Sequence, residues 1–172
     1  MRETPAQLAE LQRLLDDSLS RSSNHLRSII GAGERALTAE QLTSVLTGMR
    51  TLAISTVTAG GEPRLSAGDG HFLNGRWVFG TSVTAAKARH LAARPAVSVA
   101  LIEGEKLGVF THGTAVNLNP EEGPEHPEWP DVYAYLRKYY GAFMDRDDLV
   151  FYLVEPHWMV AWAADFDSLT ED

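Results

Sequence analysis

The 172-residue chain contains no cysteine, which excludes disulfide bridges, thiolate zinc sites and cysteine nucleophiles. Its six histidines form no HExxH motif and no close pair, and the sequence contains no Gly-x-Ser-x-Gly motif. The sequence therefore gives no support for a zinc protease or a serine hydrolase, and we predict no metal site.

Long apolar runs and a basic surface are also missing. No window reaches the roughly 18 apolar residues that a membrane helix needs. The N-terminal segment MRETPAQLAELQRLLDDSLS carries acids throughout and lacks the apolar core of a signal peptide. The net charge of −8 is unlike the clustered basic face of a nucleic-acid binder. We therefore expect a cytoplasmic protein with no membrane or nucleic-acid partner.

Hydrophobic spacing predicts helices at the start of the chain. Over residues 4–21, leucines recur at helical intervals: Leu8, Leu11, Leu15 and Leu19. A connector follows and ends in Gly31-Ala32-Gly33. Thr38 and Gln41 then form a capping-box pattern that opens a second helix. We predict a helical extension over residues 1–36 and one main domain over residues 37–172.

The main domain shows the pattern of antiparallel strands. Residues 51–81 predict a three-stranded meander, because Asn74-Gly75 is a strong hairpin signal. Further strands are expected at 96–102 and 107–118, and Pro156 separates two more at 149–156 and 157–166. Short helices are expected at 84–93 and 131–143. This pattern predicts a mainly β protein with flanking helices, an antiparallel barrel of about six to seven strands.

The segment Gly68-Asp69-Gly70-His71 superficially resembles a dinucleotide-binding loop. Leu73 occupies the place of the third glycine, and the segment lies between strands, so we reject that interpretation. Glycines inside strands often mark a β-bulge, and we predict one here. His71 is then either a structural histidine or one that points into a pocket.

A candidate anion site follows the third predicted strand. Gly80, Thr81 and Ser82 end that strand just before a short helix, and Lys87 lies within reach of the helix N-terminus. Free N–H groups at such a terminus, two hydroxyls and an ammonium group together suit a phosphate. The alternative is that Ser82 or Thr84 simply caps the helix.

The runs TLAISTVTAGGEPRLS, NGRWVFGTS and AAKARHLAARPAVSVAL, in this order and spacing, resemble the pyridoxamine 5'-phosphate oxidase-like family of flavin-binding split barrels. The resemblance covers residues 38–118 well and the last two strands loosely. It implies a homodimer of split β-barrels, with a cofactor at each subunit interface and a small-molecule substrate. The chain departs from the family pattern at His90, where Asn is usual. It also departs from it in GDGHF, where many relatives have large apolar residues in the second strand.

The resemblance also implies cofactor-binding residues, listed here in chain order: Arg64, Leu65, Ser66, Ala67, Gly80, Thr81, Ser82, Lys87, Arg89, Trp158 and Trp162. Residues 64–67 would run along the ring system. Residues 80–82 and Lys87 would hold the phosphate, with Arg89 nearby. The two tryptophans would approach the ring from the other subunit, although packing in a core or interface would also explain them.

We expect FMN as the cofactor of an oxidoreductase, and a deazaflavin coenzyme as the closest alternative. The cofactor would carry the hydride chemistry, so the sequence identifies no catalytic residue. Two other interpretations stay open. The chain could be a haem-binding or flavin-binding module, with His71 or His112 as the axial haem ligand, or an interaction domain without a ligand.

Overall fold

Tight turns and alternating apolar residues form six antiparallel strands that close into a barrel in the order β1-β2-β3-β6-β5-β4. This computed structural model describes residues 3–30 and 35–169, so the predicted Gly31-Ala32-Gly33 punctuation lies outside the described residues. The strands are β1 (Met49–Val57), β2 (Pro63–Leu73), β3 (Arg76–Ser82), β4 (Ala96–Glu103), β5 (Leu107–Asn117) and β6 (Leu149–Ala163). The prediction of an antiparallel barrel with flanking helices is confirmed.

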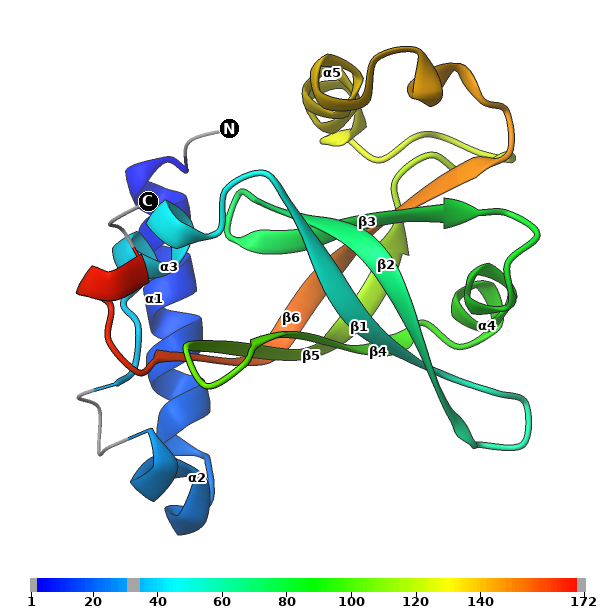
Figure 1. The fold of residues 1–172 in the computed structure, drawn as a ribbon. Coiled ribbons are helices and arrows are strands. Elements are labelled where there is room, and N and C mark those ends of the chain that lie inside the picture. The colour runs from blue at the N-terminus through cyan, green and yellow to red at the C-terminus, as the bar shows by residue number, and fades with distance from the viewer. Residues whose placement is uncertain (1–2, 31–34, 170–172) are drawn as a thin grey trace.

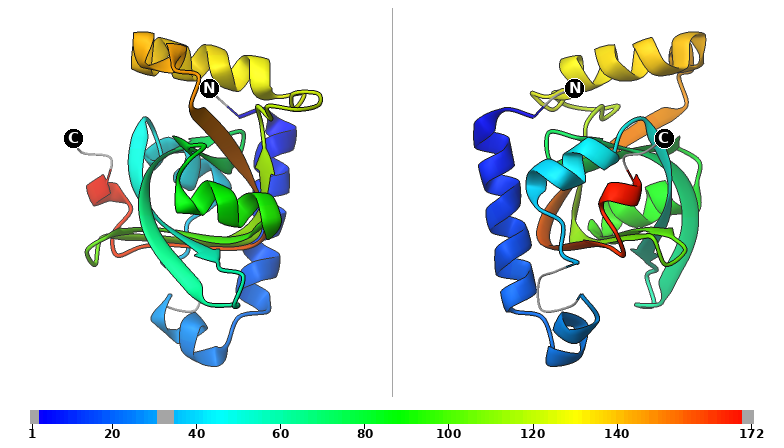
Figure 2. Two further views of the ribbon diagram at one scale, coloured as in Figure 1. Left: turned by 90° about the vertical axis from the view of Figure 1, so that its right-hand side faces the viewer. Right: turned by 60° about the vertical axis from the view of Figure 1, so that its left-hand side comes forward.

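Helices cover the barrel from several sides (Figures 1 and 2). They are α1 (Pro5–Ser20), α2 (Asn24–Ile29), α3 (Ala39–Val45), α4 (Ala86–Ala93), α5 (Trp129–Tyr140) and the short 3-10 helices η2 (Gly141–Asp145) and η3 (Asp167–Leu169). Figure 1 shows α1 and α3 beside one end of the barrel, α4 at the opposite end and α5 above a third side. None of the helices in the described ranges is long and apolar enough to cross a membrane.

The local signals for the start of α3 and for the β2–β3 hairpin are confirmed. Thr38 and Gln41 form the predicted capping box of α3. Asn74 and Gly75 have φ values of 54° and 77°, the left-handed conformation that a type I′ turn needs. The predicted connector after α1 is wrong in part, because it contains α2, which Ser23 caps by accepting a hydrogen bond from the Leu26 N–H.

The predicted bulge at Gly68-Asp69-Gly70-His71 is wrong. β1 and β2 pair without a register shift over the whole length of β1. The two glycines instead make room inside the barrel. A Cβ atom at Gly70 would collide with Leu52, and one at Gly68 would lie 2.9 Å from Cδ1 of Ile54.

The two strands predicted around Pro156 are one continuous strand, β6. His112 pairs with Trp158 and Gly113 pairs with Pro156, so His157 is an extra residue in the ladder. A bulge is a position where a sheet tolerates proline, which cannot donate a ladder hydrogen bond. The extra residue also shifts the inward-facing positions from Tyr152 and Val154 to Met159, Ala161 and Ala163, which keeps the interior apolar.

Side chains point alternately into and out of the barrel along each strand, and they form two hydrophobic clusters. The larger one fills the barrel with side chains such as Leu52, Ile54 and Trp77 and includes Leu11 and Leu15 of α1. The smaller one lies between α5 and the outward-facing side chains of β2, β3 and β6, among them Val78 and Phe151. The outer face of these three strands is therefore covered by protein over much of its length.

Helix α1 packs directly on β6. Ser18 is fully buried, and its Oγ accepts a hydrogen bond of 2.9 Å from the backbone N–H of Met159. Arg21 donates from Nη2 to the carbonyl oxygen of His157 at 3.3 Å. The division into an extension of residues 1–36 and a main domain of residues 37–172 stays a prediction.

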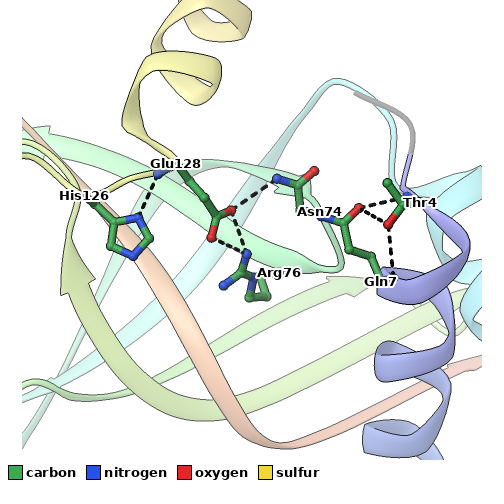
Figure 3. Close-up of polar contacts among 6 residues, drawn as sticks. All are labelled: Thr4, Gln7, Asn74, Arg76, His126 and Glu128. Atoms are coloured by element: carbon green, nitrogen blue, oxygen red, sulfur yellow. Dashed lines mark hydrogen bonds and ion pairs between the residues drawn. The ribbon is translucent and has the colours of Figure 1, made fainter.

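An ion pair holds the start of α5 against the β2–β3 hairpin (Figure 3). Arg76 Nη2 lies 2.7 Å from both carboxylate oxygens of Glu128, and Asn74 Nδ2 donates to the same carboxylate at 3.2 Å. Burial opposes ionisation of Glu128, but the hydrogen bonds from Arg76 and Asn74 outweigh it and lower the pKa of the carboxyl group. The ion pair therefore stabilises the position of α5 when Glu128 is charged.

We expect Glu128→Gln to lower the free energy of unfolding by about 1 kcal/mol at pH 7, since a charge-assisted pair is lost. Because the pKa of Glu128 is lower in the folded state, its contribution is present above the pKa of the unfolded chain. It is lost as the pH falls through the folded-state pKa. Urea unfolding at pH 7 and at pH 3 measures the difference. Glu62→Gln is the control, because the pair of Glu62 with Arg64 is exposed and should contribute almost nothing.

Candidate functional site

A pocket of about 330 Å³ lies where β2 and β3 meet Lys87 of α4, the end of α5 and η2. Its walls differ in chemistry from one end to the other. Thr81, Ser82 and Lys87 supply polar groups, whereas Phe143, Met144 and Phe151 supply apolar surface. A volume of this size and a mixture of apolar walls with a few polar groups are typical of small-molecule sites.

Lys87 is the cation at the polar end of the pocket. Its Nζ donates a hydrogen bond of 2.5 Å to the carbonyl oxygen of Ala67, which crosses from α4 to β2. Burial lowers the pKa of Lys87, and the nearby carboxylate of Asp69 opposes that shift. A partly desolvated ammonium group gains from an anionic ligand, because the ligand replaces the lost hydration.

The hydroxyls before α4 form a local turn and do not cap the helix. Ser82 Oγ lies 2.9 Å from Thr84 Oγ1 and accepts a hydrogen bond of 3.2 Å from the Thr84 N–H. Ala85 is the N-cap residue and makes no side-chain cap. The alternative that Ser82 or Thr84 caps this helix is therefore wrong. No side-chain cap competes with a ligand for the first N–H groups of α4.

The apolar end of the pocket depends on one glycine. A Cβ atom at Gly80 would lie 2.6 Å from Cε1 of Phe151. Glycine on β3 therefore allows the Phe151 ring of β6 to lie against this strand and form a wall of the pocket. Phe143 adds a second, half-exposed ring, and the guanidinium carbon of Arg146 lies 5.1 Å from its centroid.

His71 occupies the inner wall between these ends and contacts two tyrosines of α5. Its Nε2 lies 2.8 Å from the hydroxyl of Tyr140, and its Nδ1 lies 3.2 Å from the hydroxyl of Tyr135. Burial lowers the pKa of His71 to about 4, although Asp69 acts in the opposite direction. His71 is therefore neutral at pH 7, and both of its nitrogens are engaged.

Sequence reasoning missed the two tyrosines as site residues. The helical spacing in DVYAYLRKYY predicts an aromatic face that includes Tyr135 and Tyr139, and all three of Tyr135, Tyr139 and Tyr140 contact the His71 ring edge-on. The signal in the sequence was a histidine on the outer face of a strand together with an aromatic helix. Nothing local in the sequence says that the helix covers that strand.

The structure brings five of the predicted cofactor-binding residues together in the pocket lining: Ala67, Gly80, Thr81, Ser82 and Lys87. Leu65 and Ser66 line a neighbouring groove on the outer face of β1, β2 and β4, which Ala67 also lines. The groove therefore borders the pocket.

The other predicted residues lie outside the pocket lining, and their role in binding stays a prediction. Arg64 forms an exposed ion pair with Glu62. Arg89 donates to the carbonyl oxygen of Thr84 at 2.6 Å, so it supports the turn before α4. Trp158 and Trp162 lie on β6, where the Trp158 ring stacks on His112.

Among residues 3–30 and 35–169, no group of three or more histidine, aspartate or glutamate side chains is placed to hold a metal ion. The residues do fit a planar cofactor with a phosphate. The Lys87 ammonium group and the hydroxyls of Thr81 and Ser82 line one end of the pocket, and aromatic rings line the other. The Asp69 carboxylate would repel a phosphate beside it, and the Asp148 carboxylate, which is paired with Arg146, accepts a hydrogen bond from Ser82. A phosphate at this end of the pocket would therefore depend on the charge of Lys87.

A family model described as pyridoxamine 5'-phosphate oxidase matches residues 38–163. No curated protein sequence matches the chain.

Solved structures share the fold at low sequence identity. The conserved hypothetical protein Rv2991 from Mycobacterium tuberculosis is 19% identical, with a TM-score of 0.61 over 81% of this chain and 92% of its own. The heme storage protein HutZ from Vibrio cholerae is 20% identical, with a TM-score of 0.59 over 72% of this chain and 92% of its own. An F420 reductase is 20% identical, with a TM-score of 0.51 over 67% of this chain and 93% of its own.

Proposed function

Because the chain belongs to the pyridoxamine 5'-phosphate oxidase family, we propose that it is an oxidoreductase that binds a flavin-type cofactor in the pocket beside Lys87. FMN is the first candidate, and a deazaflavin coenzyme is the alternative. Both carry a phosphate and a planar ring system, and one structural relative is an F420 reductase. Its substrate would be a small molecule.

The observation that carries this proposal is the position of Lys87. Its ammonium group lies at the junction of β2 and α4, in the same pocket as Thr81 and Ser82. These three side chains and the N-terminus of α4 would hold the phosphate. The rings of Phe143 and Phe151 would contact the apolar part of the cofactor.

The cofactor would accept or donate two electrons as hydride, and the protein would supply binding, orientation and exclusion of water. Lys87 would hold the cofactor by its phosphate. The apolar wall of Phe143, Met144 and Phe151 would keep water from the reacting atoms.

We further propose that the protein is a homodimer. Leu65 is 74% exposed and Ile102 is 59% exposed, and both line the groove over β1, β2 and β4. Large exposed apolar side chains that lie together on one face mark an interaction surface. A partner seated in this groove would approach the pocket, because Ala67 lines both, and could bring Trp158 and Trp162 toward the cofactor.

Lys87→Ala should weaken binding of FMN by about 10-fold to 150-fold, because one charge-assisted phosphate contact is worth about 1.5–3 kcal/mol. Quenching of flavin fluorescence measures the affinity, and the deazaflavin coenzyme is titrated in parallel. Lys106→Ala is the matched control, because Lys106 lies in the β4–β5 turn and is exposed. Unchanged affinity in Lys87→Ala for both cofactors would contradict the proposed phosphate site.

Leu65→Glu should convert the dimer to a monomer, since it places a charge in the centre of the proposed interface. Sedimentation velocity measures the change, and an unaltered circular dichroism spectrum is expected because Leu65 is exposed in the monomer. Ile29→Glu is the control, because Ile29 lies on α2 and is also exposed. A wild-type protein that sediments as a monomer would refute the homodimer.

Haem binding is the second candidate, and the hydrogen bonds of the two histidines favour His112 over His71 as the haem ligand. Both nitrogens of His71 are engaged by tyrosines. His112 is exposed, its ring is stacked on Trp158, and only its Nδ1 is engaged, by Ser98 Oγ at 2.8 Å. Partial desolvation of its ring and the proximity of His157 lower the pKa of His112, which favours the neutral form that binds metals.

If the chain binds haem, haemin should give a Soret band that is lost in His112→Ala and kept in His71→Ala. Absorption spectroscopy of the purified protein with added haemin measures this. A Soret band that survives in His112→Ala would exclude His112 as the axial ligand, and the absence of any band in the wild type would leave the flavin-type cofactor as the proposal.

A further inference from the structure

The two tyrosines of α5 and His71 of β2 form one continuous chain of hydrogen-bonding groups. Nε2 of His71 lies 2.8 Å from the Tyr140 hydroxyl, and Nδ1 lies 3.2 Å from the Tyr135 hydroxyl. Only 2% of His71 is exposed, so no bulk water competes for either nitrogen. The imidazole ring therefore connects one phenol to the other.

This chain can carry a single proton in two arrangements. A neutral imidazole has one N–H group and one acceptor nitrogen, so one tyrosine donates to the ring and the other accepts from it. Because burial lowers the pKa of His71 to about 4, the neutral ring is the form at physiological pH. When Nε2 carries the hydrogen, the hydroxyl hydrogen of Tyr140 is free to point into the pocket.

The two phenols have different surroundings. Tyr140 lines the pocket, whereas Tyr135 does not, and both are partly exposed to solvent. Burial and the charge of Asp69 raise the pKa of Tyr140 to about 12, so its hydroxyl stays protonated and acts as a donor. The chain therefore runs from a protonated group in the pocket to a group near solvent.

Other groups also act on His71: burial lowers its pKa and outweighs the charge of Asp69 and a hydrogen bond with the backbone of Gly48, which both favour the protonated ring. Tyr139 contacts the ring edge-on at 4.9 Å between centroids, and its hydroxyl accepts from the Met49 N–H at 3.4 Å. Asp69, two residues away on β2, is exposed and lines the pocket. The cations that line the same pocket as Tyr140 are Lys87 and Arg146.

We propose that Tyr140 is the catalytic proton donor of this pocket and that His71 and Tyr135 resupply its proton from solvent. The O–H bond of Tyr140 breaks as the substrate gains a proton, and the Nε2 proton of His71 moves to the Tyr140 oxygen. The Tyr135 proton moves to Nδ1, and Tyr135 takes a proton from water. One proton passes from solvent to substrate, and every group keeps its number of hydrogens. The ring ends as the Nδ1–H tautomer, so it must return to the Nε2–H tautomer before the next turnover.

This inference rests on the proposed function, in which a reduced flavin-type cofactor supplies the hydride. A substrate that gains a hydride must also gain a proton to become a neutral product. A side chain of the protein must donate this proton. A well-placed general acid accelerates such a step by about 10²-fold to 10⁴-fold. The uncharged, protonated hydroxyl of Tyr140 in the same pocket as Lys87 would serve this purpose.

The first experiment compares two electron acceptors with the enzyme carrying reduced FMN. Menadione gains two electrons and two protons on reduction, whereas ferricyanide gains one electron and no proton. Tyr140→Phe should slow menadione reduction by about 100-fold or more and change ferricyanide reduction by less than about twofold. Tyr135→Phe should slow menadione reduction as well, by about 10-fold, because it breaks the resupply of protons.

Tyr133→Phe is the matched control, because Tyr133 lies on α5, contacts Trp129 and does not line the pocket. Equal losses with both acceptors in Tyr140→Phe would overturn the proposal, since they would indicate damaged cofactor binding or electron transfer. Menadione reduction at the wild-type rate in Tyr140→Phe would also overturn it.

The second experiment uses the cofactor-free protein and tests the chain without catalysis. Long-range ¹H–¹⁵N spectra report which imidazole nitrogen of His71 carries the proton. An unpaired buried N–H is costly, so the proton should lie on the nitrogen that keeps an oxygen partner. We expect Nδ1–H in Tyr140→Phe and Nε2–H in Tyr135→Phe.

The same tautomer in both variants would show that the ring cannot reverse its polarity, and the relay would be refuted. A wild-type protein that binds no flavin-type cofactor would refute the proposed function, and the imidazole spectra would still decide whether the proton chain exists. The two failures are therefore distinguishable.

Discussion

The site depends on the alternation of side chains along β2, β3 and β6 together with the cover that α5 places on their outer face. In a closed barrel every second residue points inward, so the outward-facing side chains need water or another element. Here α5 and η2 supply that element over part of the face. Where their cover ends, Ala67, Gly80 and Ser82 are left beside a pocket instead of beneath a helix.

The same alternation explains why β6 can be continuous through Pro156. A strand of 15 residues must keep its apolar side chains inside at both ends, and a proline in its middle removes one ladder hydrogen bond. The extra residue His157 accommodates the proline and reverses the inward set of residues. Gly113 on β5 allows the close approach, because a Cβ atom there would collide with the backbone of Glu155.

The sequence predicted those parts of the fold that depend on local chemistry. Asn74-Gly75 specified a turn through its left-handed backbone, and Thr38 with Gln41 specified a helix start. The errors arose where a distant partner decides the outcome. Gly68 and Gly70 suggested a bulge, but Leu52 and Ile54 of β1 occupy the space that they leave. The polar half of the pocket was predictable because residues 80–87 are contiguous, whereas the His71 contacts require α5, which begins 58 residues later.

Burial acts alike on Lys87 and His71, two of the basic side chains of the pocket, and their neighbours separate their roles. The pKa of Lys87 and the pKa of His71 are both lowered by desolvation. Lys87 has a carbonyl oxygen as its partner, which does not neutralise a charge, so it still gains from an anion. His71 has a phenol at each nitrogen, and both suit a neutral ring. An anionic group is therefore favoured beside Lys87, and the wall formed by His71 and Tyr140 is left for uncharged chemistry. This difference orients any ligand that carries a phosphate at one end and a reactive ring at the other.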